Sequence, residues 1–177
     1  MELNVSHLLM QPSGSSREYH LDEIANLTED IRGARIQGSV RLLRTNKSVW
    51  VSATLNSAID SECGRCLIPF SYPIHLEIEE EFVPTLNPMT GAKVTPPDDD
   101  NKDYCTIDEN HILDLTGTVR EYTIMALPMK PLCDHQCAGL CSTCGSDLNT
   151  NVCSCEAPLD ARWGPLLELM SVTPDKN

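Results

Sequence analysis

The sequence predicts an α+β fold in which an antiparallel β-sheet is covered by an amphipathic helix and followed by a Cys-rich, zinc-binding C-terminal segment. Three observations lead to this prediction. Apolar and polar residues alternate through most of residues 36–82, and apolar residues recur every three to four positions in residues 115–126. Six of the nine cysteines fall within residues 133–155. We therefore expect a sheet domain over residues 1–132 and a zinc-binding tail with a C-terminal helix packed on it over residues 133–177.

The alternating region predicts three strands, over residues 36–42, 49–59 and 68–82, each with one buried face. Thr45-Asn46-Lys47 is typical of a hairpin turn and separates the first two strands. Pro69 and Pro73 cannot donate to a β-ladder, so the third strand is expected at a sheet edge or to contain a bulge.

The regions around these strands are less regular. Residues 3–21 predict two short strands, and residues 22–33 a brief helix or a loop. Residues 84–103 contain several prolines and the run Asp98-Asp99-Asp100, which indicates a mobile acidic loop, and residues 104–107 predict a short strand.

Two helices are expected in the C-terminal half. The first is amphipathic, with Leu115, Val119, Tyr122 and Met125/Ala126 on one face. Asp114 is placed to cap its start, and Pro128 forces its end. A second helix is expected over residues 159–170, although Pro165 interrupts its pattern.

The charge balance restricts the classes of partner. The chain has 13 Lys and Arg against 26 Asp and Glu, a formal net charge of −13. Nucleic-acid-binding proteins normally present a basic face, so we expect no DNA partner and favour a basic protein partner. No apolar run reaches the roughly 18 residues of a membrane span, and the N-terminus lacks the pattern of a secretory signal. A cytoplasmic location and no membrane partner are expected.

Eight of the cysteines can fill two four-sulfur sites, because a C-x2-C turn directs two sulfurs at one tetrahedral ion. We predict two metal sites with the following ligands: Cys63, Cys66, Cys133 and Cys137 in the first, and Cys141, Cys144, Cys153 and Cys155 in the second. Four thiolates close a zinc site and leave no position for a substrate, so both sites are expected to be structural. Cys105 remains as a free or buried thiol.

The cysteines also resemble other known motifs. Cys63-Gly64-Arg65-Cys66 is similar to a thioredoxin-type redox motif, but strands rather than a helix flank it. Residues 137–144 have the cysteine spacing of radical-SAM enzymes, but the chain lacks the βα units of their barrel. Four cysteines also suit an iron–sulfur cluster, and His135 could replace one cysteine as a ligand.

Two charged surfaces remain as alternatives. Glu77, Glu79 and Glu81 share the polar face of their strand, either as solvated charges or as a docking stripe for a basic partner. A small basic patch could contact rRNA directly, and its members are Arg32, Arg35, Arg41, Arg44 and Lys47.

The cysteine-bearing segments together resemble the bacterial YceD family. The matching segments are Cys63–Leu67, Glu121–Cys133, Cys137–Gly145 with Leu148-Asn149, Cys153–Cys155 and Asp160–Trp163. The resemblance covers roughly residues 34–170. It implies a non-enzymatic ribosome biogenesis factor that supports accumulation of 23S rRNA and large-subunit assembly. A ribosomal protein or a large-subunit precursor particle is the implied partner, and the resemblance implies no catalytic residues.

Overall fold

The computed structural model describes residues 1–29, 31–94, 105–155 and 161–164. The chain divides into two compact units. The first contains Met1–Ser61 and Pro69–Pro131, and the second contains Glu62–Ile68 and Leu132–Asn177. A short segment between two strands of the first unit therefore belongs with the C-terminal part of the chain.

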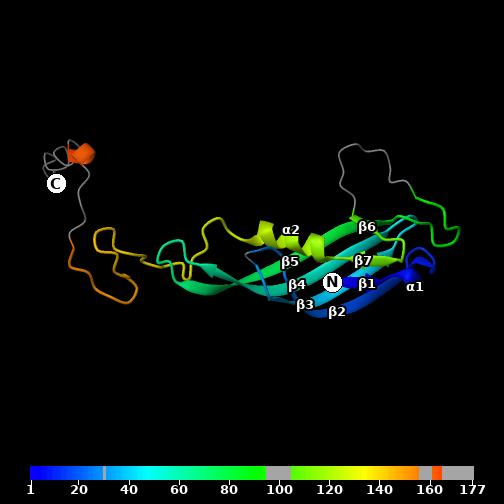
Figure 1. Ribbon diagram of the computed structural model, residues 1–177, viewed down its shortest axis with the longest axis horizontal. Helices are drawn as coiled ribbons and strands as arrows, with labels where there is room; N and C mark the ends of the chain where they lie inside the picture. Colours follow the sequence, from blue (N-terminus) through cyan, green and yellow to red (C-terminus); the bar gives the residue numbers. More distant parts are fainter. Residues whose placement is uncertain (30, 95–104, 156–160, 165–177) are drawn as a thin grey trace, which may run out of the picture. The chain divides into compact units, whose positions relative to one another are not determined.

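The first unit is a seven-stranded sheet with the strand order β1-β7-β6-β5-β4-β3-β2 (Figure 1). Its strands are β1 (Glu2–Asn4), β2 (Ser16–Ala25), β3 (Ala34–Arg44), β4 (Val49–Glu62), β5 (Pro69–Pro84), β6 (Cys105–Ile107) and β7 (Ile112–Asp114). The three predicted long strands correspond to β3, β4 and β5, and the predicted strand at 104–107 corresponds to β6. The hairpin turn is also confirmed, since the backbone N–H of Thr45 donates to the carbonyl of Ser48 at 3.0 Å.

One face of the long strands is buried, as their alternating sequence predicts. In β4, Val49, Val51, Ala53 and Leu55 are buried, whereas the residues that alternate with them are exposed or half-buried. Ile78 and Phe82 of β5 belong to the same core. Each such side chain stabilises the fold by about 1.5–3 kcal/mol when it leaves water.

The N-terminal part differs from the prediction. Residues 3–21 form β1, the short helix α1 (Ser6–Leu9) and the start of β2, instead of two strands alone. The residues from Asp22 onward were expected to form a helix or loop, but β2 continues to Ala25 and pairs Ala25 with Ala34. Pairing with β3 supplies hydrogen bonds that outweigh the weak local preference of this segment.

β5 is not an edge strand, and the sheet is not wholly antiparallel. Strand β5 lies between β4 and β6, and β6 pairs with β5 in parallel over Phe82–Pro84. Pro69 and Pro73 lie before this paired stretch and are exposed, which explains why prolines are tolerated in an internal strand. The long connection between β5 and β6 permits the parallel pairing.

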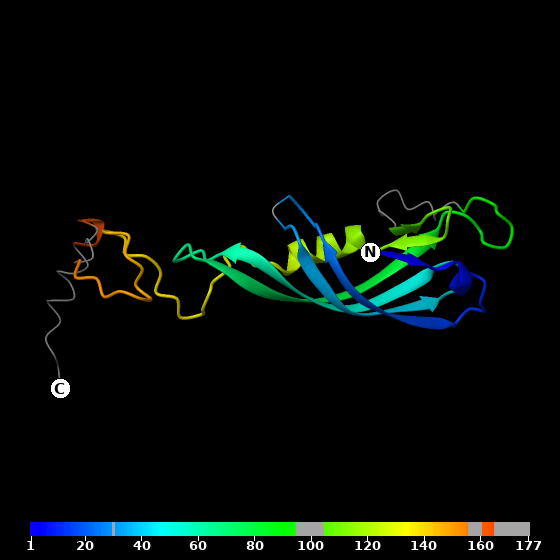
Figure 2. The ribbon, with the colours of Figure 1, turned by 60° about the horizontal axis from the view of Figure 1, so that its bottom comes forward.

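Helix α2 (Thr116–Ala126) packs beside β5. The N-cap position is Leu115 instead of the predicted Asp114, although the carboxylate of Asp114 accepts a hydrogen bond from the N–H of Thr116, the first residue of the helix, at 2.9 Å. The helix ends before Leu127, which is extended because Pro128 follows it. Figure 2 shows the helix lying along the sheet.

The buried side of α2 is less apolar than the sequence predicted. It contains Thr118, Val119 and Thr123, whereas Met125 is 70% exposed and Ala126 is also exposed. The predicted apolar stripe therefore fails in the last turn of the helix, and Thr118 and Thr123 supply much of its buried side.

Two predicted segments fall largely outside the described residues. Of the acidic loop, residues 85–94 are described and Leu86 bridges to Lys93, whereas 95–104 lie outside. Of the predicted helix over 159–170, only residues 161–164 are described, with a 3-10 turn at Ala161–Trp163. None of the helices in the described ranges has the length and apolar character that crossing a membrane requires.

Candidate metal centres

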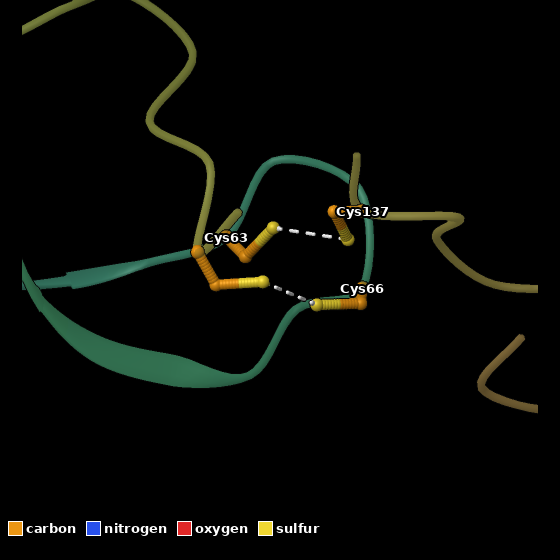
Figure 3. Close-up of side chains that lie close together, drawn as sticks. Cys63, Cys66 and Cys137 are labelled. Atoms are coloured by element: carbon orange, nitrogen blue, oxygen red, sulfur yellow. Dashed lines mark hydrogen bonds between the residues drawn. The ribbon is translucent and has the colours of Figure 1, made fainter. Parts of the chain in front are cut away.

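The first C-x2-C turn is held by its own backbone. The N–H of Cys63 donates to the carbonyl of Ile68 at 2.9 Å, and the N–H of Leu67 donates to the carbonyl of Cys63 at 2.9 Å. This turn brings Cys63 and Cys66 close together, and Figure 3 shows the sulfur of Cys63 turned towards that of Cys137.

The second C-x2-C turn has the same hydrogen-bond pattern. The N–H of Cys141 donates to the carbonyl of Ser146 at 2.8 Å, and the N–H of Gly145 donates to the carbonyl of Cys141 at 2.9 Å. The chain therefore builds one local structure twice, around Cys63–Cys66 and around Cys141–Cys144.

The structure gathers the eight predicted sulfurs into the two predicted groups of four. Within each group all sulfurs lie within 4.8 Å of one another. In the first group, the sulfurs of Cys63 and Cys137 are 3.8 Å apart and those of Cys66 and Cys133 are 3.6 Å apart. In the second group, Cys153 has its sulfur 3.4 Å from that of Cys144 and 3.4 Å from that of Cys141.

These separations match a metal ion better than a disulfide. A disulfide requires about 2.05 Å between sulfurs, and all nine cysteines are free. A tetrahedral ion with metal–sulfur bonds of about 2.3 Å places its four sulfurs about 3.8 Å apart. Both groups could therefore hold a metal ion, and four soft thiolates suit zinc or iron.

Polar side chains around the first group orient its cysteines. Arg65 donates from Nη1 to the carbonyl of Cys137 at 2.8 Å, and Asn149 donates from Nδ2 to the sulfur of Cys137 at 3.4 Å. The side-chain oxygen Oδ1 of Asn149 also accepts a hydrogen bond from the N–H of Ala138 at 2.8 Å. Neither Arg65 nor Asn149 was singled out from the sequence, where only their position among the cysteines could have suggested this role.

The thiols of the first group differ in pKa because their surroundings differ. Burial opposes ionisation of Cys63, but hydrogen bonds with three backbone groups, led by Cys133, outweigh it and lower the pKa of Cys63 to about 6. Burial, together with the neighbouring thiol of Cys66, raises the pKa of Cys133 to about 12.

The second group shows the same separation. The hydroxyl and backbone of Ser146 lower the pKa of Cys144 to about 6, whereas the neighbouring thiols of Cys153 and Cys144 raise the pKa of Cys155 to about 12. Each group thus holds one thiol that ionises readily and one that keeps its proton. A bound divalent cation would favour the thiolate form of all four.

Cys105 and His135 lie outside both groups. Cys105 is half-buried on β6 in the first unit, with its sulfur 3.8 Å from the hydroxyl of Thr118, and burial raises its pKa. This agrees with a thiol left over from metal binding. His135 is exposed, and neither four-cysteine group among the described residues includes it.

The Cys63–Cys66 pair is poorly placed for disulfide exchange. These residues are 0% and 3% exposed, and exchange requires an approach to the attacking sulfur. Their sulfurs instead face the other two cysteines of the first group.

The predicted basic patch is partly neutralised. Arg35 forms a two-bond contact with the carboxylate of Asp22, at 2.8 and 2.9 Å. Arg32 donates to the carbonyl of Glu29 at 2.8 Å, and Arg44 is partly buried and donates to the carbonyl of Ser48 at 3.0 Å. Only part of the patch therefore remains to meet phosphate groups.

The predicted acidic stripe lies on the exposed face of β5. Glu77, Glu79 and Glu81 are exposed. Glu77 has a neighbouring histidine, His75, at 3.5 Å, and Glu81 accepts a hydrogen bond from the hydroxyl of Ser48.

Comparisons with known proteins agree with the resemblance found in the sequence. Residues 51–170 match the family model described as large ribosomal RNA subunit accumulation protein YceD. An uncharacterised protein of Mycobacterium tuberculosis is 26% identical over 81% of this chain and 66% of its own length. An uncharacterised protein of Mycobacterium leprae is 28% identical over 78% of this chain and 61% of its own length.

A plant protein also matches. The chloroplastic large ribosomal RNA subunit accumulation protein YCED homolog 1 of Arabidopsis thaliana is 27% identical over 79% of this chain and 51% of its own length. The chain thus spans between about half and two thirds of the length of these relatives. No solved structure matches it. Since the family model covers more than half of the chain, with β5, most of β4 and all eight grouped cysteines, the chain belongs to the YceD family.

Proposed function

We propose that the chain is a non-enzymatic factor in biogenesis of the large ribosomal subunit, and that its two four-cysteine groups bind structural zinc. It acts in the cytoplasm, supports 23S rRNA accumulation, and binds a precursor particle or one of its ribosomal proteins. Membership of the YceD family supports the ribosomal role. The observation that carries the zinc proposal is the gathering of eight sulfurs at tetrahedral separations.

The described part of the second unit buries almost no apolar side chains, which supports a role for an ion in its folding. Among its described residues, those that are buried are three cysteines and one glycine, namely Cys63, Cys66, Cys137 and Gly139. A segment this poor in buried apolar side chains gains little from the hydrophobic effect. Zinc binding supplies the missing free energy of folding, as it does in other small zinc domains.

The same sites support a role without catalysis. Four protein thiolates complete the coordination of a tetrahedral ion, so no position stays open for water or substrate. The net charge of −13 and the partly neutralised basic patch favour a basic protein of the particle, met by the acidic stripe, over naked rRNA.

Sedimentation of cell extracts tests the ribosomal role. The tagged full-length chain is expected to sediment with large-subunit precursors, and its depletion to lower 23S rRNA relative to 16S rRNA. Migration only as free protein, together with unchanged rRNA levels, would contradict the proposal. Binding to rRNA alone, with a steep salt dependence, would instead favour the direct rRNA contact.

Metal analysis separates the zinc proposal from a thiol redox role. Protein purified without chelator is expected to carry two zinc ions per chain and to show no disulfide reductase activity. A metal-free chain that cycles a Cys63–Cys66 disulfide would replace the proposal by a redox function.

A further inference from the structure

The two candidate metal centres differ in how far solvent reaches their sulfurs. In the first, Cys63, Cys66 and Cys137 are 0%, 3% and 3% exposed. In the second, Cys144 and Cys155 are exposed. Because oxidation of cysteine follows access to its thiolate, an oxidant in solution meets the second centre first.

The two centres also differ in how the chain holds them. The first joins two distant segments, since Cys66 and Cys133 are 67 positions apart. The second is local, because its sulfur pairs lie only 9 and 12 positions apart, at Cys144–Cys153 and Cys141–Cys153. Opening the second centre therefore needs a change in one short segment, which costs less free energy than separating the two segments of the first.

We propose that the second centre is a site of thiol oxidation, at which Cys144 reacts with hydrogen peroxide and forms a disulfide with Cys153 while the first centre keeps its ion. This inference rests on the zinc binding proposed above. It adds that the two ions have different fates, so that oxidation removes one and leaves the other.

The oxidation proceeds in two balanced steps. The thiolate of Cys144 attacks one oxygen of peroxide, which gives a sulfenic acid and releases hydroxide. The thiolate of Cys153, 3.4 Å away, then attacks the sulfenic sulfur, so that the S–S bond forms and a second hydroxide leaves. The two sulfurs together lose two electrons and peroxide gains them. Of the four residues that would hold zinc here, only Cys141 and Cys155 would remain as thiolate ligands, so the ion would be released.

Cys144 is the first residue to react because of its position. It is exposed, as is Cys155, whereas Cys153 and Cys141 are only partly so, and Cys144 also has the sulfur of Cys153 within 3.4 Å of its own. Cys153 is the resolving residue because its sulfur lies 3.4 Å from that of Cys144.

The test uses the zinc-loaded full chain treated with peroxide while a chromophoric chelator reports free zinc. We expect one zinc ion to be released quickly and the other at least about tenfold more slowly. Peptide mapping after alkylation should find a Cys144–Cys153 disulfide, with Cys63 and Cys66 still reduced. A thiol reductant with added zinc should restore the bound metal.

Two variants sharpen the test. Cys144→Ser should remove the fast phase of release, and Cys105→Ser, which changes a cysteine outside both centres, should leave it unchanged. If Cys144→Ser fails to retain zinc at the second centre, the wild-type peptide map still decides which cysteines react first.

The outcomes distinguish this inference from the proposal beneath it. A chain isolated without zinc overturns both before peroxide is added. Two bound ions that leave at the same rate, or first-centre cysteines that oxidise first, overturn only the inference and leave structural zinc intact.

Discussion

Leu67 and Gly145 occupy equivalent positions in the two C-x2-C turns. Each follows the second cysteine of its turn with a left-handed backbone, at φ of 59° for Leu67 and 72° for Gly145. The backbone N–H of each donates to the carbonyl of the first cysteine at 2.9 Å. A left-handed residue at this position is therefore needed to close both turns. In the first turn this residue is Leu67, whose side chain disfavours the left-handed conformation, so its backbone is strained.

Gly145→Ala measures this requirement without a steric clash, because a Cβ at this position has no neighbour within 4 Å. The left-handed backbone should cost the variant about 1–2 kcal/mol. If that cost falls on the metal-bound form, zinc affinity at the second centre drops about tenfold. A chelator competition measures the change, and unaltered affinity would show that the turn tolerates a side chain there.

Leu67→Gly is the converse change in the first turn. Leu67 is 62% exposed, so removing its side chain loses little packing, whereas the backbone strain is relieved. We expect the first centre to bind zinc at least as tightly as in the wild type, by the same competition. A marked loss of affinity would mean that the leucine side chain contributes contacts that its exposure does not suggest.

Removal of one ligand should empty one centre. Cys66→Ser deletes a buried member of the first group, and its hydroxyl is a poor substitute for a thiolate on zinc. Elemental analysis should find zinc reduced from two ions per chain to one. Cys105→Ser is the matched control and should retain both, whereas equal loss in the two variants would contradict the assignment of Cys105 as a residue outside the centres.

The sheet contains a glycine that no other residue can replace without movement. A Cβ on Gly38 of β3 would lie 2.0 Å from the backbone oxygen of Thr54. Gly38→Ala should therefore lower the free energy of unfolding by about 3 kcal/mol or more, measured by urea denaturation.

Gly117→Ala provides the contrast within the same unit. Gly117 lies in α2, where an added Cβ has no neighbour within 4 Å, so alanine should stabilise the protein by about 0.5–1 kcal/mol. Similar effects of the two substitutions would contradict the close approach of β3 and β4 at Gly38.

Asp114, which precedes α2, predicts a pH dependence of stability. Partial burial opposes ionisation of Asp114, but hydrogen bonds from the hydroxyl and N–H of Thr116, at 2.6 and 2.9 Å, hold its pKa below the ordinary 3.8. The folded state therefore binds a proton less readily than the unfolded state. Asp114 contributes its full stability above about pH 3.8, and loses it as the pH falls through the lower folded pKa.

An NMR titration of the Asp114 carboxyl carbon checks this directly. In Asp114→Asn, which keeps a hydrogen-bond acceptor for Thr116, the fall of stability below pH 3.8 should be less steep. A carboxyl that titrates at or above 3.8 in the folded protein would contradict the role of Thr116 as its donor.

The sequence predicted best those parts of the structure in which the type of each residue depends on whether its own position is buried or exposed. Val49, Val51 and Leu55 alternate with polar residues because one face of β4 is buried, and the pattern is local. The cysteine groups followed from the ligand count and the short spacing around Cys141 and Cys144. The structure brings these residues together as expected.

The parts that the sequence did not predict depend on distant partners. Asp22–Ala25 continue β2 because β3 pairs with them, and β6 lies parallel to β5 after a long connection. Neither relationship leaves a periodic pattern in the residues concerned. The hydrogen bond from Asn149 to the sulfur of Cys137 has the same origin, since nothing in an isolated asparagine indicates a neighbouring thiolate.

The grouping of residues 62–68 with the C-terminal part of the chain has a consequence for biosynthesis. On the ribosome, Cys63 and Cys66 emerge as half of a centre, and Cys133 follows Cys66 only after 67 further positions. Until then the nascent chain offers an ion two sulfurs instead of four, a weak and exchangeable attachment. If this centre binds an ion as proposed, translation must proceed well past the sheet before all four ligands are available. A polypeptide that ends after Pro131 would lack Cys133 and Cys137 and could not complete the site.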